Sequence, residues 1–136
     1  MNGYSLIDLR IIGDENGSLI ALEENGNVPF DIKRVYYIFN TKVGVRRGFH
    51  AHLKLRQLLI CTSGSCTVLL DDGRKKVDVK LDSPSKGLII EGLLWREMYD
   101  FSPDCVLMVL ADEHYREEDY IRNYDSFMDE VQKNGI

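Results

Sequence analysis

Two of the three histidines in this 136-residue chain stand two positions apart, at His50 and His52, in the sequence Arg-Arg-Gly-Phe-His-Ala-His. On a β-strand, residues i and i+2 point to the same face, so the two imidazoles would project together. Small β-barrels form ligand sites in their interior, which is where such a pair would act. Imidazole titrates near neutral pH, so the pair could bind a metal or exchange protons with a substrate.

A metal site at this pair would need at least a third ligand. Residues 53–57 contain no acid, and the remaining histidine, His114, lies in the polar segment 112–115. The pattern therefore favours acid–base chemistry, in which an imidazole removes a proton alpha to a ketone and donors such as Tyr36 stabilise the enediolate. The alternative is a purely structural role, in which both histidines are held by hydrogen bonds inside the barrel and take no part in a reaction.

The charge pattern predicts a small anionic ligand. The net charge of −5 argues against nucleic acid as a general partner. However, no acidic residue occurs between Asp31 and Asp71, and this stretch contains Lys33, Arg34, Lys42, Arg46, Arg47, Lys54 and Arg56. The stretch is either a solvated face or a local positive field that would suit a phosphate or diphosphate.

Arg46 and Arg47 precede the histidine pair, and a guanidinium group suits bidentate contact with phosphate. Regular strand alternation would put Arg46 on the face of His50. A bulge at Gly48 would reverse this and put Arg47 there instead. Both assignments stay open at the level of sequence.

The rest of the chain reads as short β-rich segments separated by turns. Strands are predicted over 4–10, 18–24, 33–41, 45–52, 57–61, 66–70, 76–81, 87–91, 94–101 and 105–111, with a hairpin turn at 63–65. Apolar residues from Tyr120 to Val131 recur at helical spacing and predict a C-terminal amphipathic helix at about 119–133. We therefore expect one all-β domain over residues 1–136, an antiparallel barrel or jelly roll over about 4–111 with a helical tail.

The absence of targeting signals and the pattern of cysteines both predict a cytoplasmic protein. No apolar run approaches the length of a membrane helix and no secretory signal is evident, so a cytoplasmic protein without a membrane partner is expected. Cys61, Cys66 and Cys105 lack metal-site spacing and are interpreted as buried, reduced thiols. Cys61 and Cys66 could face each other across the 63–65 hairpin.

Blocks along nearly the whole chain resemble the nucleotide-sugar 3,4-ketoisomerases, small cupins that act on dTDP-4-keto-6-deoxyglucose. The blocks are 17–19, 29–38, 47–52 with Gln57, 82–84 with 87–88, 95–98, 100–101, 105–107 and 119–124. The resemblance implies a metal-independent cupin without a cofactor. It also implies a homodimer, in which N-terminal strands are often exchanged between subunits.

The same resemblance implies roles for individual residues. His50 would move the proton, with His52 and Tyr36 as the other catalytic groups. The related 3,5-epimerases carry an Arg-Gly-x-His element whose arginine contacts the diphosphate, which favours Arg47 there. Further implied substrate contacts are Arg46, Arg34, Gln57, Trp95, Arg96 and Asn16, and Arg96 is more typical of members whose product has the gluco configuration.

The implied reaction removes the proton from carbon 3 of the 4-keto sugar, forms an enediol and returns a proton to carbon 4. The 3-keto-6-deoxyhexose produced would supply 3-amino-3,6-dideoxy sugars for lipopolysaccharide or other surface glycans. One alternative is a 3,5-epimerase of the same fold, which would need a proton donor on the opposite face of the ring. Two others are a non-catalytic cupin that binds sugar nucleotides and a metal-dependent oxygenase.

Overall fold

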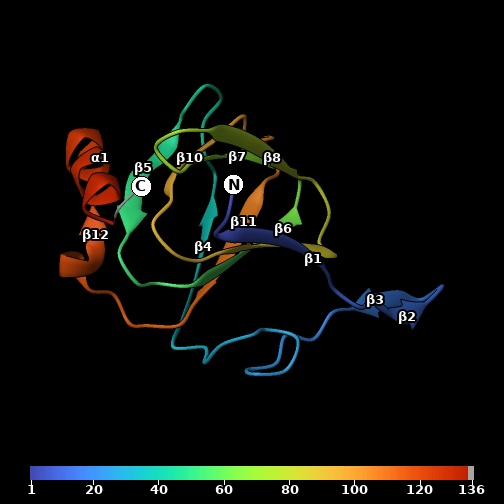
Figure 1. Cartoon of the computed structure of the whole chain (residues 1–136). Helices are drawn as coiled ribbons and strands as arrows, with labels where there is room; N and C mark the ends of the chain where they lie inside the picture. The colour runs from blue at the N-terminus through green and yellow to red at the C-terminus, as the bar shows by residue number, and fades with distance from the viewer. Residues whose placement is uncertain (135–136) are drawn as a thin grey trace.

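Two five-stranded antiparallel sheets face each other and contain most of the strands (Figure 1). The computed structural model describes residues 1–134. One sheet has the order β1-β9-β6-β11-β4 and the other β12-β5-β10-β7-β8. No pairing between described strands joins the two sheets, so the predicted antiparallel β-fold is confirmed as an open, two-sheet form of the barrel.

The elements follow one another closely along the chain. They are β1 (Tyr4–Asp8), β2 (Ile12–Asp14), β3 (Gly17–Leu19), β4 (Arg34–Phe39), β5 (Arg47–His52), β6 (Gln57–Ser63), β7 (Cys66–Asp71), β8 (Lys76–Leu81), β9 (Lys86–Ile90), β10 (Trp95–Tyr99), β11 (Val106–Ala111), the 3-10 turn η1 (Glu117–Asp119), β12 (Tyr120–Ile121) and α1 (Tyr124–Lys133). No helix among residues 1–134 is long and apolar enough to cross a membrane.

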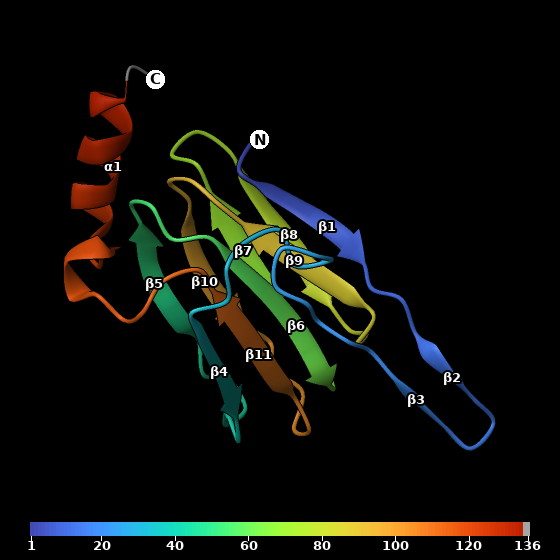
Figure 2. The same ribbon diagram turned by 90° about the horizontal axis from the view of Figure 1, so that it is seen from below.

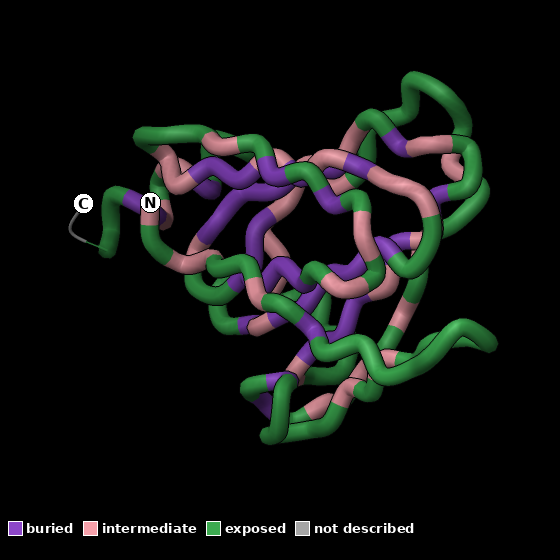
Figure 3. Tube along the Cα trace, turned by 90° about the vertical axis from the view of Figure 1, so that its right-hand side faces the viewer, coloured by how far each residue is buried: buried purple, intermediate pink, exposed green. Residues whose placement is uncertain are grey.

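Alternation along the strands builds the core between the sheets. Leu59 and Cys61 of β6 face Val68 and Leu70 of β7 in one buried cluster. The outer faces are covered too, which explains why β6 is apolar at successive positions. The segment around Phe30 covers the outside of the first sheet and α1 covers the outside of the second. In Figure 3 the buried stretches lie mostly toward the middle of the molecule and the exposed stretches mostly around its edge.

Three local predictions were wrong. The strand predicted over 18–24 ends at Leu19 and pairs with the unpredicted strand β2, which gives a small hairpin projecting from the sheets (Figure 2). The turn at 63–65 is not a hairpin, because β6 and β7 lie in different sheets and the turn carries the chain between them.

The third correction concerns the C-terminal helix, which begins at Tyr124 rather than near 119. The side chain of Asn123 accepts a hydrogen bond from the backbone N–H of Ser126 and caps the helix there. Tyr120 and Ile121 instead form β12 and pair with His52 and Ala51 of β5. This change brings Tyr120 beside the histidine pair.

Candidate active site

His50 and His52 lie on β5, between β10 and β12. Arg96 of β10 is the direct partner of His50 in the sheet, and Tyr120 of β12 is the partner of His52. The two imidazole centroids are 5.0 Å apart with their planes at 83°. The Tyr120 ring lies 5.1 Å from His50 and 4.3 Å from His52. The predicted common face of the two histidines is therefore present.

A bulge in β5 decides which arginine shares that face. Gly48 has φ +93° and a Cβ there would lie 2.9 Å from the carbonyl oxygen of Arg96, so only glycine fits. The register shifts at this point, and Arg47 pairs with Met98, which belongs to the core between the sheets. Arg47 therefore shares the inner face with His50.

Arg46 points to the outer face of the same sheet. Its Nε lies 2.6 Å from Oε1 of Glu97, and its guanidinium stacks 4.1 Å from the ring centroid of Tyr99. Trp95 is also on the outer face, where it packs against Phe127 of α1. Of the two arginines that the sequence left open, the structure brings only Arg47 to the face of His50, and it does not bring Trp95 there.

A buried polar chain crosses from one sheet to the other beside His50. Nη1 of Arg96 donates to Oε1 of Gln57, and Nε2 of Gln57 donates to the hydroxyl of Tyr36 at 3.1 Å. Since that hydroxyl accepts from Gln57, its own proton is free to be donated elsewhere. Burial raises the pKa of Tyr36, so the hydroxyl stays a donor at neutral pH.

Arg96 is 2% exposed and has no carboxylate partner among residues 1–134. Its remaining hydrogen bonds go to the carbonyl oxygen of Leu94, from Nε at 3.3 Å and from Nη2 at 3.0 Å. Burial lowers the pKa of Arg96 to about 10, so it keeps its charge at neutral pH. A buried cation with no carboxylate in contact is costly, and Asp119 acts on Arg96 only from beyond contact distance, so an anion or a developing negative charge would be stabilised at this position.

Asp119 fixes the protonation pattern of His52 and was missed from the sequence. Its Oδ2 lies 3.1 Å from Nδ1 of His52, and its Oδ1 accepts from the backbone N–H of Lys54 at 3.0 Å. A carboxylate only accepts, so the neutral imidazole carries its hydrogen on Nδ1 and presents Nε2 as an acceptor. That Nε2 is buried and has no partner among the described residues.

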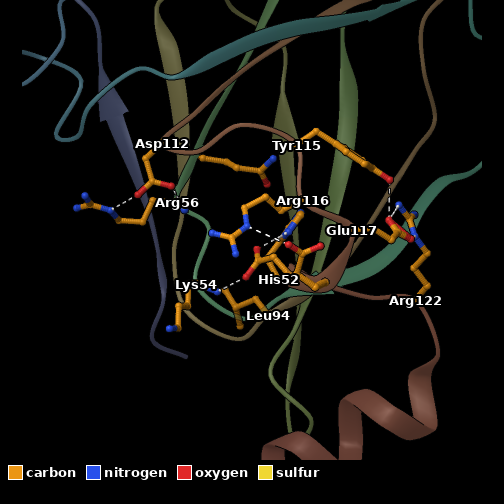
Figure 4. Close-up of polar contacts among 12 residues, drawn as sticks. His52, Lys54, Arg56, Leu94, Asp112, Tyr115, Arg116, Glu117 and Arg122 are labelled. Atoms are coloured by element: carbon orange, nitrogen blue, oxygen red, sulfur yellow. Dashed lines mark hydrogen bonds and ion pairs between the residues drawn. The ribbon is translucent and has the colours of Figure 1, made fainter.

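A cavity of about 360 Å³ opens beside the histidine pair and is lined by His52, Tyr120, Arg34, Lys54 and Arg116, among others. Nε of Arg34 is buried without a hydrogen-bond partner. Arg56, from the same basic stretch, is instead paired with Asp112 at 3.0 Å (Figure 4). The basic stretch thus contributes Arg34 and Lys54 to a polar cavity, while Arg46 and Arg56 are neutralised by acids from later in the chain.

Comparison with known proteins decides the family. The WxcM-like, C-terminal family model (FdtA) matches residues 2–132. A TDP-4-oxo-6-deoxy-alpha-D-glucose-3,4-oxoisomerase from Aneurinibacillus thermoaerophilus is 56% identical over 128 residues, which are 94% of this chain and 92% of that protein. The chain belongs to the TDP-sugar 3,4-ketoisomerases.

Solved structures of the family superpose closely. QdtA, a sugar 3,4-ketoisomerase from Thermoanaerobacterium thermosaccharolyticum in complex with TDP, matches with a TM-score of 0.96 and 46% identity, and the match covers 98% of each chain. The TDP-quinovose 3,4-ketoisomerase WlaRB from Campylobacter jejuni matches with a TM-score of 0.90 and 49% identity, over 95% of this chain and 99% of that one. These matches confirm the predicted cupin-type fold.

The structure places the predicted site residues of this ketoisomerase in three groups. One group comes together around the buried polar chain and consists of His50, His52, Tyr36, Gln57 and Arg96. In the second group, Arg34 lines the adjoining cavity and Arg47 lies on the inner face of β5. Arg46 and Trp95 lie on the outer face. Asn16 lies at the tip of the projecting hairpin and does not reach the other residues within the chain (Figure 2).

No described histidine or carboxylate completes a cluster of three metal ligands with His50 and His52. The geometry thus agrees with the acid–base interpretation of the pair, and activity without a metal or another cofactor stays a prediction. Tyr120 and Asp119 are the residues that sequence reasoning missed. Their nearest signal was the block 119–124, which was assigned to the helix.

We predict an acidic limb near pH 4 in the pH profile of kcat/KM. Burial, and then the charge of Arg96, lower the pKa of His50 to about 4 from its usual 6.5, so the base is neutral at pH 7 and is lost only as the pH falls through about 4. Histidines in the unfolded chain protonate near 6.5, so folding stability declines below that pH. Circular dichroism at each pH separates unfolding from titration, and a limb near 6.5 in folded protein would contradict the assignment.

We further predict that Asp119→Asn lowers kcat at least about tenfold, since acid–base positioning is lost. The backbone N–H of Lys54 needs an acceptor, so the amide oxygen would face Lys54 and the amide NH₂ would face His52. Nδ1 of His52 would then accept, and its hydrogen would move to Nε2. Asp129→Asn, on the exposed side of α1, makes the same charge change and should keep normal kcat; equal kcat in both variants would remove Asp119 from the mechanism.

Proposed function

We propose that this protein converts dTDP-4-keto-6-deoxyglucose into a dTDP-3-keto-6-deoxyhexose, an intermediate for 3-amino-3,6-dideoxy sugars of surface glycans. One observation carries the proposal: a neutral imidazole, His50, is paired across the sheet with Arg96, a buried cation that no described carboxylate contacts. A base beside a buried positive charge is what enolisation of a ketone requires. The three free, buried thiols suit an enzyme of the reducing cytoplasm.

The proton transfers in the proposed reaction balance within the sugar. His50 takes the proton from carbon 3, the carbon 3–carbon 4 double bond forms, and the carbonyl electrons move onto oxygen 4. The resulting enediolate is stabilised by the charge of Arg96 and by the hydroxyl of Tyr36. Reprotonation of carbon 4 by the imidazolium of His50 yields the ketone at carbon 3 and regenerates the base.

Oxygen 3 must lose its proton and oxygen 4 must gain one during the same reaction. The unpartnered Nε2 of His52 is the acceptor suited to this transfer, since Asp119 keeps the hydrogen of this imidazole on Nδ1. Burial is the largest cause that lowers the pKa of His52. His52 is therefore a neutral relay between the two oxygens, while His50 serves the two carbons.

In this proposal Arg34 and Arg47 bind the diphosphate of the substrate. Arg34 lines the cavity and has a buried, unpartnered Nε, and Arg47 lies on the inner face of β5. Both are free of carboxylate partners in the described part of the chain. Guanidinium groups without an internal counter-ion favour an anionic ligand.

NMR spectroscopy of the protein with dTDP-4-keto-6-deoxyglucose in heavy water tests the function. A ketone at carbon 3 with deuterium at carbon 4 is expected, and the configuration at carbon 4 distinguishes gluco from galacto products. Deuterium at carbons 3 and 5 with the ketone still at carbon 4 would establish the 3,5-epimerase instead. If the nucleotide sugar binds but its spectrum does not change, the protein would be a non-catalytic cupin that binds sugar nucleotides.

We also propose that the protein is a homodimer in which the β2–β3 hairpin crosses to the second copy. The hairpin projects from the sheets, and its flanking side chains Ile11, Ile12 and Leu19 are 55%, 46% and 57% exposed. An apolar groove beside it, lined by Leu22, Ile60 and other residues, has a volume of about 440 Å³. In such a dimer Asn16 can approach the site of the partner, which it does not reach in its own chain.

Light scattering is expected to give twice the chain mass for the wild type. Ile12→Asp should shift the protein to the monomer and lower turnover, because a carboxylate would be buried in the interface. Val43→Asp is the matched control, since Val43 is 86% exposed on another loop, and it should stay dimeric and active. A monomeric wild type, or a fully active Ile12→Asp dimer, would overturn the proposed interface.

A further inference from the structure

The three cysteines of the chain meet between the sheets, at the end of the core away from the histidines. Sγ of Cys61 lies 3.5 Å from Sγ of Cys66 and 3.7 Å from Sγ of Cys105. The three sulfur atoms all lie within 4.8 Å of one another. Gln57 of the polar chain begins β6 and Cys61 follows four residues later, so the two ends of the core are separated by about 13 Å at the usual rise of a strand.

The cluster has the geometry of a three-coordinate sulfur site. Its members come from β6, from the start of β7 and from the residue before β11, and they are 0%, 1% and 4% exposed. Bonds of about 2.3 Å from sulfur to an ion would place the sulfurs about 4.0 Å apart in a planar triangle, and closer in a pyramid. Among residues 1–134 this is the single set of three or more metal-ligating side chains that come together.

Charge decides which ion the cluster suits. All three sulfurs lie in the apolar core between the sheets, among side chains such as Leu59 and Leu107. No basic side chain is paired with any of the three in the described part of the chain. A monovalent or divalent ion on three thiolates would leave net negative charge in an apolar core, which is costly, whereas a trivalent ion leaves none.

We propose that Cys61, Cys66 and Cys105 form a binding site for a trivalent thiophilic ion, with arsenite as the representative ligand. Three S–H bonds and three As–O bonds of As(OH)₃ break, three As–S bonds form, and three water molecules leave. Arsenic stays trivalent, no thiol is oxidised, and no charge is created. This balance suits a site in an apolar core.

Binding would tie the two sheets together at this end of the core. Cys61 belongs to one sheet and Cys66 to the other, so the bound ion cross-links them. A ligand that binds only the folded arrangement raises the unfolding temperature by mass action. Because the cluster lies away from His50 and Arg96, the loaded protein should keep its turnover.

The test uses the full chain, reduced with a phosphine and incubated with sodium arsenite, both as native protein and during refolding. Intact-mass spectrometry should show one arsenic atom bound with the loss of three hydrogens, together with a higher unfolding temperature. Cys61→Ala, Cys66→Ala and Cys105→Ala should each bind arsenite about a hundredfold more weakly, because the third, intramolecular bond is lost. The shift on adding arsenite is compared within each variant, which corrects for any cost of the substitution itself.

Absence of bound arsenic after refolding in its presence would overturn the site, since refolding removes the barrier of access to a buried cluster. Equal affinity in the wild type and the three variants would also overturn it. A Cys61–Cys66 disulfide that is already present in the purified protein, resists the phosphine and excludes arsenite would assign the cluster to redox chemistry instead. Mass and unfolding temperature are independent of the ketoisomerase activity, so failure here and failure of the proposed function are distinguishable.

Discussion

His50→Asn should lower kcat by about 10²- to 10⁴-fold while the affinity for TDP changes little. Asparagine is close to histidine in size but has no nitrogen that accepts a proton at neutral pH. The position is half-buried on β5, and the bulge next to it is formed by Gly48, so the substitution leaves the backbone determinants in place. Turnover is measured by NMR and nucleotide affinity by calorimetry.

The exchange of the proton at carbon 3 with heavy water should disappear in the same variant, because His50 removes that proton. Gln132→Asn is the control: Gln132 is exposed on α1 and does not line the cavity beside the histidines, so this variant should retain most of kcat. Near-normal turnover of His50→Asn, or continued exchange at carbon 3, would show that another group is the base.

The sequence was sufficient for those parts of the site that depend on strand alternation. His50 and His52 share a face because they are two residues apart on one strand, and Trp95 and Arg96 must then lie on opposite faces. Alternation alone could not choose between Arg46 and Arg47, since that choice depends on the bulge at Gly48 and on the register against β10. The resemblance to the ketoisomerases favoured Arg47, and the geometry of the bulge agrees with it.

Residues between β11 and α1 were the hardest to place. Tyr120 and Ile121 continue the helical spacing of Tyr124 and Phe127, so periodicity extended the helix too far. The helix begins at Tyr124 because the side chain of Asn123 caps it and because Tyr120 and Ile121 pair with β5. This pairing is a contact between residues far apart in the sequence, so no local pattern predicts it. Asp119 was missed for the same reason.

The protonation states of the site also depend on long-range contacts. Arg96 is charged in any context, yet its burial without a carboxylate arises only when β10, β6 and β4 converge. The low pKa of His50 follows first from the burial of His50 itself and then from the charge of Arg96. The residue types and their spacing indicated acid–base chemistry, but they could not predict whether each group is protonated or deprotonated in the folded protein.

Arg96→Met should lower kcat by about 10²- to 10³-fold, the usual effect of removing one group that stabilises a developing oxyanion. Methionine keeps an unbranched side chain in the same space and removes only the charge and the donors. The substitution relieves a buried cation, worth several kcal/mol, but leaves the acceptors of Gln57 and Leu94 unpaired at about 1–3 kcal/mol each. These effects oppose each other, so the unfolding free energy should change much less than the activity.

The pH profile gives this variant a signature that a loss of packing would not produce. After burial, the charge of Arg96 is the next cause of the low pKa of His50. Without that charge the pKa should rise above about 4, while burial still holds it below 6.5, and the acidic limb of kcat/KM should move with it. Arg46→Met removes an arginine from the outer face of the same sheet, where Glu97 neutralises it, and should leave the limb in place. If both variants kept the acidic limb of kcat/KM near pH 4, a group other than Arg96 would be lowering the pKa of His50. If only Arg46→Met moved the limb, the assignment of the two arginines to the inner and outer faces at the bulge would be reversed.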